Sequence, residues 1–587
     1  MSKKNNAQVN ENSLVSSNKN AALNEYLTKG AQQGNAKAQF TIGKIYLEGK
    51  DGLEKDIDVA ISWLTKAAEQ KYAEAQFVLG KVYLEDNASI KQDLGVAITW
   101  LNKAAEQKYA EAQFVLGKIY LEDNASIKQD LGVAITWLNK AAEQKYAEAQ
   151  CLLGKIYLEG NASIKQDLGV AIGLIREAAD QSAEARFILG KIYLEGNASI
   201  KQDLGVAISW LAKAAEQKYA EAQFALGKIY LEGNGRIKQD LGVAINWLTK
   251  SAEQQYSEAQ FTLGKIYLEG KDGLEKDMDV AISWLTKASE QQYSEAQFTL
   301  GKIYLEGNAS IKQDLGIAIS WLTKAAELSH VGANHMLGSI NLKKCVETEG
   351  AEESLFQRVV NIFVTKNDCE ISLARFNKAA EQKYAEAQFA LGKIYLEGNS
   401  RVKQDLGVAI NWLTKAAEQK YAEAQFTLGK IYLEGKDGLE KDMDVAISWL
   451  TKAAKQKHQE SQLTLGNFYL KENDIAKQDL GIVLLKEAAA QNHPEALYKL
   501  GLIYSEAQVK KQELKASVDW FTQAAELGHA GAQYKLAEAI CKGRGIDANP
   551  ILVERWLQKA MEQDYADANY MFHQLIAGEV VCINEDL

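Results

Sequence analysis

Apolar residues recur along this chain with the period of an amphipathic helix. Within residues 73–84, Phe77, Gly80, Tyr83 and Leu84 are spaced so that they fall on one helical face. The segment carries no proline. We therefore predict a helix here and call it the A helix.

A second helical pattern follows the first after a polar, turn-forming linker. Ala97, Trp100, Leu101 and Ala104 form its apolar stripe, and Asp93 precedes it. Aspartate is a favoured N-cap because its carboxylate accepts hydrogen bonds from the free N–H groups of the first turn. We call this predicted element the B helix, and one A helix with the B helix that follows it a repeat.

The string Leu-Gly-Lys-Ile-Tyr-Leu-Glu marks the A helix and returns about every 37 residues. Its glycine stands at Gly43, Gly80, Gly117, Gly154, Gly190, Gly227, Gly264 and Gly301, and weaker copies follow at Gly338, Gly392, Gly429, Gly466 and Gly501. The spacing shrinks to 36 between Gly154 and Gly190 and grows to 54 between Gly338 and Gly392. Such a period predicts stacked helix pairs that contact only their neighbours.

Every tryptophan of the chain stands at one position of the B helix. A large aromatic residue confined to one phase of a repeat is predicted to be a packing residue. The eleven are Trp63, Trp100, Trp137, Trp210, Trp247, Trp284, Trp321, Trp412, Trp449, Trp520 and Trp556.

The mid-helix glycine needs a reason, because it costs about 1 kcal/mol relative to alanine. We predict that Gly80 lets the alanine pair of the B helix, Ala104 and Ala105, approach the A-helix backbone. Ser257 with Gln260 has the spacing of a capping box at the start of an A helix. Ser294 with Gln297 repeats that spacing.

The pattern divides the chain into four segments: a disordered polar tail at 1–20, near-identical repeats at 21–342, an irregular insertion at 343–376, and repeats that diverge towards the C-terminus at 377–587. We predict about fourteen A–B pairs. They are flanked by a lone B helix at 21–33, with Tyr26 at the tryptophan position, and by a lone A helix at 566–577.

These motifs resemble the Sel-1-like repeat family, a branch of the tetratricopeptide-type helical repeat proteins. The resemblance covers about residues 21–577 and implies an all-α fold, a right-handed α/α solenoid whose A helices line the concave surface. It also implies an adaptor or scaffold that binds proteins. One repeat matches the family pattern at Ala259, Gln260, Leu263, Gly264, Tyr267, Gly270, Asp277, Ala281, Trp284, Lys287 and Ala288.

Composition narrows the classes of partner. The net charge of −11 disfavours nucleic acid and anionic membranes as partners. No apolar run is long enough to span a bilayer, and the N-terminus lacks the apolar core of a secretory signal. Five scattered cysteines indicate a reducing compartment and no disulfide framework. We expect a cytoplasmic protein, or one exported without a cleaved signal.

No motif for catalysis, metal binding or cofactor binding accompanies the repeats. His330 and His529 precede A helices at matching positions, but neither His-Glu-x-x-His nor Cys-x-x-Cys is present. Cys345 and Cys369 share the irregular segment, where a disulfide or metal pair is the less favoured interpretation. We therefore predict no enzyme activity, no cofactor and no metal.

The irregular segment is the main candidate for partner recognition. Residues 343–370 match no repeat, and Arg375 then replaces tryptophan. Two interpretations stay open, a decayed repeat with a long loop and a partner-docking element. The candidate partner-binding residues are Leu355, Phe356, Val359, Val360, Ile362, Phe363 and Arg375.

The sequence therefore favours a non-enzymatic scaffold or adaptor that binds a protein or peptide on the solenoid surface, without nucleic acid and without membrane insertion. One alternative is a bacterial effector or host-interaction protein that acts on a host protein. A less favoured one is a cell-wall-related or β-lactam-binding enzyme, since some members of the resembled family are linked to β-lactam binding.

Overall fold

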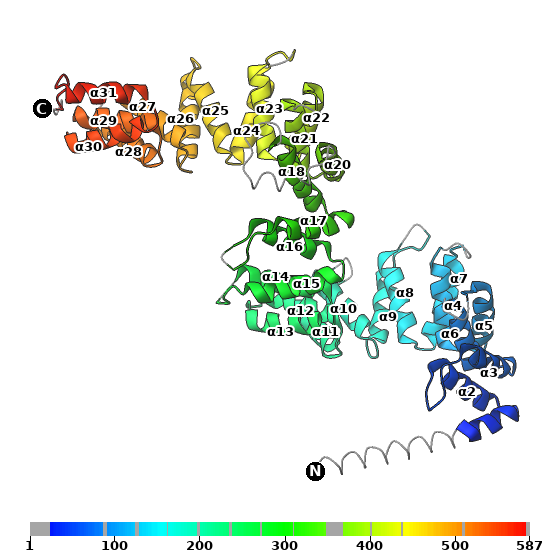
Figure 1. Ribbon diagram of the computed structural model, residues 1–587. Helices are drawn as coiled ribbons and strands as arrows, with labels where there is room; N and C mark the ends of the chain where they lie inside the picture. The colour runs from blue at the N-terminus through cyan, green and yellow to red at the C-terminus, as the bar shows by residue number, and fades with distance from the viewer. Residues whose placement is uncertain are drawn as a thin grey trace, which may run out of the picture. The chain divides into compact units, whose positions relative to one another are not determined.

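The computed structural model describes residues 24–582 apart from short internal segments. The segments left out are 86–90, 124–127, 161–162, 197–199, 234–236, 271–272, 309, 348–367, 399–401, 436–437 and 507–510. All the longer secondary-structure elements among the described residues are helices, and these residues contain no strand. The helices follow one another in A–B pairs, as Figure 1 shows in chain order. The predicted all-α solenoid of about fourteen pairs is therefore confirmed.

The chain divides into two compact halves, Met1–Gln291 and Gln292–Leu587. In the first half, residues 24–32 are helical and seven A–B pairs follow. Their A helices are α2 (Ala36–Glu48), α4 (Ala73–Leu84), α6 (Ala110–Leu121), α8 (Ala147–Glu159), α10 (Ala183–Glu195), α12 (Ala220–Glu232) and α14 (Ser257–Glu269). Their B helices are α3 (Ile57–Glu69), α5 (Leu94–Glu106), α7 (Leu131–Glu143), α9 (Leu168–Ala178), α11 (Leu204–Glu216), α13 (Leu241–Glu253) and α15 (Met278–Glu290).

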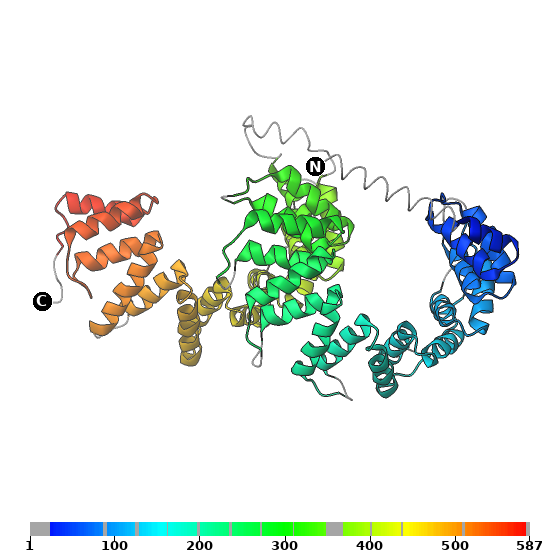
Figure 2. The same cartoon turned by 90° about the horizontal axis from the view of Figure 1, so that it is seen from below.

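The second half continues the same alternation, which Figure 2 shows from a second side. Its A helices are α16 (Ser294–Glu306), α18 (Val331–Glu347), α21 (Ala385–Glu397), α23 (Ala422–Glu434), α25 (Gln459–Leu470), α27 (Pro494–Glu506), α29 (Ala530–Cys541) and α31 (Ala566–Ile576). Its B helices are α17 (Leu315–Glu327), α20 (Asp368–Glu381), α22 (Leu406–Glu418), α24 (Met443–Lys455), α26 (Ile475–Ala489), α28 (Lys511–Glu526) and α30 (Pro550–Met561).

The Lys-Gln-Asp string that precedes seven of the fourteen paired B helices caps two helix ends at once. Gln92 Nε2 donates to the carbonyl oxygen of Leu84, the last residue of α4, at 2.8 Å. Asp93 Oδ1 accepts from the backbone N–H of Val96 in α5 at 2.9 Å. The predicted aspartate N-cap is therefore confirmed, and the glutamine beside it caps the preceding helix.

The mid-helix glycine does allow a close approach, but to other residues than predicted. A Cβ on Gly80 would lie 2.6 Å from Leu101 Cγ and 3.2 Å from the carbonyl oxygen of Ala97. The alanine pair, Ala104 and Ala105, instead belongs to the core between this repeat and the next. The prediction was wrong about the partner because Leu101, and not the alanine pair, contacts Gly80, while Leu101 and the alanines both reach the core with Leu116 of the following A helix.

The tryptophans pack between repeats without being fully buried. Trp137 contacts the buried cluster that joins Leu101 of the preceding repeat to Leu116 of its own repeat. Lys140 Nζ lies 4.0 Å from the centroid of the Trp137 ring, within the range of a cation–π contact. All eleven tryptophans are half-buried, while the leucine that follows Trp100, Leu101, is completely buried.

The predicted capping box is absent. The N-cap of α14 is Tyr256 and Ser257 is already inside the helix. Gln260 is buried and donates to the carbonyl oxygen of Ala252 in the preceding B helix at 2.9 Å, and it accepts from Gln291 at 2.7 Å. The glutamine thus links successive repeats, which is why it cannot reach back to cap its own helix.

The C-terminal end carries one disulfide, between Cys541 and Cys582. The sequence did not predict it, because the two cysteines are 41 residues apart and follow no repeat spacing. The pair forms because the chain returns after α31 to the end of α29. Cys151 is a free, buried thiol.

Candidate functional site

Two equivalent surface cavities lie side by side on the A helices of the first half. One is lined by residues of α8, α9 and α10, the other by residues of α10, α11 and α12. Each has a volume of about 590 Å³. Phe187 and Lys191 of α10 line both cavities. We call the two cavities together the A-face groove.

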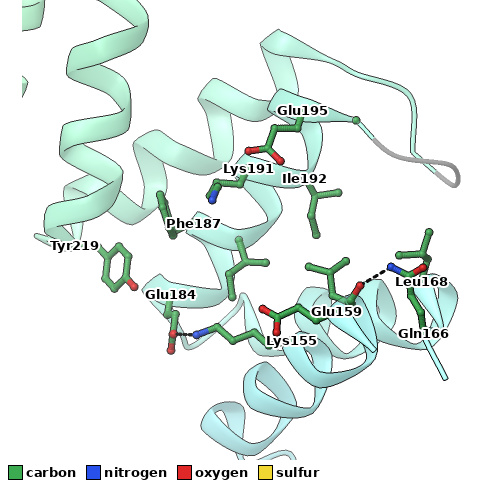
Figure 3. Close-up of a pocket in the computed structure, with 13 residues that line it drawn as sticks. Lys155, Glu159, Gln166, Leu168, Glu184, Phe187, Lys191, Ile192, Glu195 and Tyr219 are labelled. Atoms are coloured by element: carbon green, nitrogen blue, oxygen red, sulfur yellow. Dashed lines mark hydrogen bonds and ion pairs between the residues drawn. The ribbon is translucent and has the colours of Figure 1, made fainter. Parts of the chain in front are cut away.

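The A-face groove has an apolar lining and a charged rim (Figure 3). In the first cavity, Leu158, Phe187 and Ile192 supply apolar surface, and Lys155 pairs with Glu184 across neighbouring A helices. Burial, the largest single influence, would lower the pKa of Lys155, but its hydrogen bond to Glu184 and its attraction to Glu184 and other nearby acidic groups together raise that pKa. The groove can therefore contact both apolar and charged side chains of a ligand.

An aromatic pair stands at the edge of each cavity. The rings of Phe187 and Tyr219 have their centroids 5.4 Å apart, and those of Phe224 and Tyr256 are 5.2 Å apart. Burial raises the pKa of Tyr219, which keeps its phenol neutral. The same pairing recurs at Phe40–Tyr72, Phe77–Tyr109, Phe114–Tyr146 and Phe389–Tyr421.

Histidine replaces the tyrosine at some repeat boundaries of the second half. His330 stacks on Phe298 with a centroid distance of 4.4 Å. Its Nδ1 accepts from the backbone N–H of Ala333 at 3.1 Å, and its Nε2 lies 2.9 Å from Glu295 Oε2. His529 repeats this arrangement with Ala532 and Glu495. These histidines therefore cap A helices and tie them to the preceding repeat.

The repeat formed by α8 and α9 departs from its neighbours, a difference that the sequence analysis missed. Leu174 stands at the tryptophan position, and Cys151 stands where other A helices have phenylalanine. Burial raises the pKa of the Cys151 thiol to about 12, so it is not an activated nucleophile. In the A helix that follows, α10, Arg186 replaces the buried glutamine and donates to the carbonyl oxygens of Ala179 and Asp180. The shortened spacing of 36 residues was the available signal.

Most of the candidate partner-binding residues lie outside the described residues. These are Leu355, Phe356, Val359, Val360, Ile362 and Phe363. The side chains of Cys345 and Cys369 lie outside them as well. Arg375 is described: it is half-buried in α20, and its Nη1 lies 3.4 Å from Asn334 Oδ1 of α18. Arg375 is therefore engaged with a residue at the position of the buried glutamine, and burial lowers its pKa.

The described part of the chain shows neither a metal-binding cluster nor a membrane-spanning helix. Nowhere in the described ranges do three or more His, Cys, Asp or Glu side chains gather closely enough to hold a metal ion. None of the described helices combines the length and the apolar character needed to cross a bilayer.

Comparisons with known proteins identify the repeat. The model of the Sel1 repeat matches more than half of the chain, at residues 36–72, 73–109, 110–146, 147–182, 183–219, 220–256, 257–293, 294–330, 385–421, 422–458, 494–529 and 530–565. No curated protein gave a significant match.

Two solved structures are similar at 30% sequence identity. The first is c5321, a protective antigen of uropathogenic Escherichia coli strains that displays an SLR fold, with a TM-score of 0.52 over 83% of this chain and 98% of that one. The second is a Sel1 repeat protein from Oxalobacter formigenes, with a TM-score of 0.44 over 54% of this chain and 91% of that one.

Proposed function

Because the chain belongs to the Sel1 repeat family, whose members generally mediate protein–protein interactions, we propose that it is a non-enzymatic scaffold that holds an extended segment of a partner protein in the A-face groove. The observation that carries the proposal is the recurrence of one cavity, about 590 Å³ in size, in neighbouring repeats with corresponding linings. An extended peptide can place successive side chains in such cavities, since its own contacts are also periodic.

The chemistry of the groove supports a peptide as the ligand. Phe187 and Tyr219 offer rigid aromatic surface of the kind that dominates binding energy at protein interfaces. Lys191 and Glu184 lie among these rings and supply the polar rim that excludes water and selects charge.

Reversing one charge tests the groove. We expect Lys191→Glu to weaken partner binding by about tenfold, or about 1.4 kcal/mol, because Lys191 lines both cavities. The matched control is Lys218→Glu, an equally exposed lysine that lines a cavity on the B helices instead. A photo-crosslinker at position 191 would first identify the partner, and a titration would then compare the variants. Equal affinities for the two variants would refute the groove as the binding site.

One observation supports a second candidate function at the contact with a host. The similar E. coli protein is a protective antigen, so we also propose that this chain acts on a host protein. Crosslinking during contact with host cells tests this proposal. Recovery of only the producing cell's own proteins would refute it.

A further inference from the structure

The tryptophan position of the B helix differs in three repeats and in the lone B helix at the start of the array. Leu174, Arg375 and Leu484 replace tryptophan in the repeats, and Tyr26 replaces it in the lone helix. Beside two of the tryptophans, a small surface cavity lies between successive B helices. It has a volume of about 530 Å³ beside Trp247 and about 510 Å³ beside Trp412, with corresponding linings.

Beside Leu484 the corresponding cavity is larger, about 820 Å³. It is bounded by α24, α25 and α26 and reaches Leu465 and Tyr469 of the A helix α25. The corresponding residues Leu226 and Tyr230 do not line the cavity beside Trp247. The space that an indole ring closes in other repeats is therefore open here, and we call it the Leu484 cavity.

The surface beside the Leu484 cavity carries two exposed apolar side chains. Leu480, which lines the cavity, is 46% exposed. Val483 is 48% exposed, and all eleven tryptophan-bearing B helices have a polar residue at its position. Exposed branched side chains beside an open cavity indicate a surface that is covered in a complex.

The charges at the rim are exchanged relative to the other repeats. Lys455 stands where Glu216 lines the regular cavity, and Glu487 stands where Lys250 lines it. Gln462 Nε2 donates to Glu487 Oε2 at 2.8 Å, although Glu487 itself is exposed. Lys455 is exposed and, within the ranges that the structure describes, forms no ion pair. Lys455 and Lys457 outnumber Glu487 among the residues that line the cavity, so the rim presents a net positive charge to a ligand.

We propose that the Leu484 cavity receives a tryptophan side chain of a partner protein whose neighbouring residues are acidic. The other repeats provide the template, because their own indole rings occupy this position under a lysine, as Trp247 does under Lys250. Lys455 takes the place of that lysine from the neighbouring helix. The inference rests on the proposed scaffold function, since it assigns a second contact to a protein partner, but it uses the B helices and not the A-face groove.

A short fluorescent peptide with one tryptophan between aspartates is the probe for the full-length protein. We expect fluorescence anisotropy to show saturable binding, weakened by about tenfold or more when the tryptophan of the peptide is replaced by alanine. Replacing its aspartates by lysines is expected to weaken binding as well, because Lys455 and Lys457 line the cavity. No saturable binding, or equal binding of the alanine peptide, would overturn the proposal.

Filling the cavity from within gives the sharpest test. Leu484→Trp restores the residue of the other repeats and is expected to abolish peptide binding. The matched control, Leu174→Trp, makes the same change at the same position of another repeat and is expected to leave binding unchanged. Circular dichroism and thermal melting check that both variants fold. Binding that survives Leu484→Trp in a folded protein would overturn the proposal.

A milder variant keeps the test valid if Leu484→Trp does not fold. Lys455→Glu restores the residue of most other repeats and is expected to weaken binding of the aspartate peptide several-fold without changing the melting temperature. Unchanged affinity in this variant would count against the charged rim and the proposal with it.

Two other occupants are distinguished by the same experiments. If a second copy of this chain filled the cavity, the wild type would self-associate in sedimentation and Leu484→Trp would not. If a free indole compound were the ligand, N-acetyl-tryptophanamide would compete as well as the peptide does. Either result would overturn the proposal. The effect of Lys191→Glu on partner binding does not depend on these results or on whether the peptide binds. The test of the A-face groove is therefore independent of the test of the Leu484 cavity.

Discussion

Leucine at the tryptophan position comes with glutamate three residues later. Leu174 is followed by Glu177 and Leu484 by Glu487, whereas Trp100 is followed by Lys103, whose Nζ lies 3.9 Å from the ring centroid. Without an indole ring the lysine has no aromatic face to cover. The glutamate accepts instead from the buried glutamine of the same repeat, at 2.8 Å in both repeats. In the two repeats with leucine at the tryptophan position, the buried glutamine therefore donates to this glutamate.

Gly80→Ala tests the close approach at the residue scale. Alanine favours helix by about 1 kcal/mol, but its Cβ would lie 2.6 Å from Leu101 Cγ. We expect the cost of overpacking to exceed the gain in helix propensity, so that the variant destabilises the repeat by about 1–3 kcal/mol. In the matched control Gly95→Ala, the nearest atom, Asp93 Oδ1, is 3.5 Å away, so no loss of stability is expected. Hydrogen exchange in α4 and α5 measures both changes, and equal protection in the two variants would contradict the packing explanation.

At the scale of the element, both helices of the repeat and the aspartate N-cap were predictable from the sequence, because they depend on local spacing. The turn from the B helix to the next A helix was not predictable. It places non-glycine residues such as Lys108 at a φ of 63°, a conformation that glycine adopts more easily. Gly34 and Gly528 occupy the same position with a φ of 88°, and they were the only local signal.

The candidate site was less predictable than the helices, because cavities arise between repeats. Leu465 and Leu484 belong to successive helices, and together they line a cavity in a repeat that lacks the indole ring. The sequence shows that this repeat has no tryptophan, but it does not show that a cavity results. The family resemblance predicts only where the A-face groove lies, on the A helices. It does not predict the paired rings at its edge, such as Phe187 with Tyr219, which are recognised only in the folded structure.

The N-terminus of α25 should respond to pH. His458 Nδ1 accepts from the backbone N–H of Ser461 at 3.2 Å, which needs the neutral ring. Burial lowers the pKa of His458, although Glu423 and Glu460 oppose it. Its contribution to stability is therefore complete above about pH 6.5, the unfolded value, and is lost as pH falls from there through the lower folded pKa.

The matched variant for this pH dependence is His458→Tyr, because most repeats carry tyrosine at this position. We expect the wild type to lose hydrogen-exchange protection in α25 between pH 7 and pH 5, and the variant to lose less. Identical pH profiles would show that the loss of the cap does not limit the stability of this helix.

At the scale of the whole molecule, the repeats are joined only through neighbours. Most core clusters of the described residues combine a B helix with the A helix that follows, as Leu211 with Leu226 and Leu248 with Leu263 do. The cluster at the C-terminal end runs on through successive repeats, from Leu463 to Met571. In such an array stability is a sum of repeat terms and nearest-neighbour terms. Damage to one junction should therefore stay local and leave distant repeats folded.

Trp247→Ala tests this locality. Full burial would make the change cost about 3–5 kcal/mol, but Trp247 is half-buried, so we expect a smaller loss, about 2–3 kcal/mol. Trp247 packs on the cluster of Leu211 and Leu226, and hydrogen exchange should accelerate in α11, α12 and α13. Protection in α2 to α5 is expected to stay unchanged, because no core cluster joins those helices to Trp247. A uniform loss of protection along the first half would refute nearest-neighbour coupling and indicate one cooperative unit.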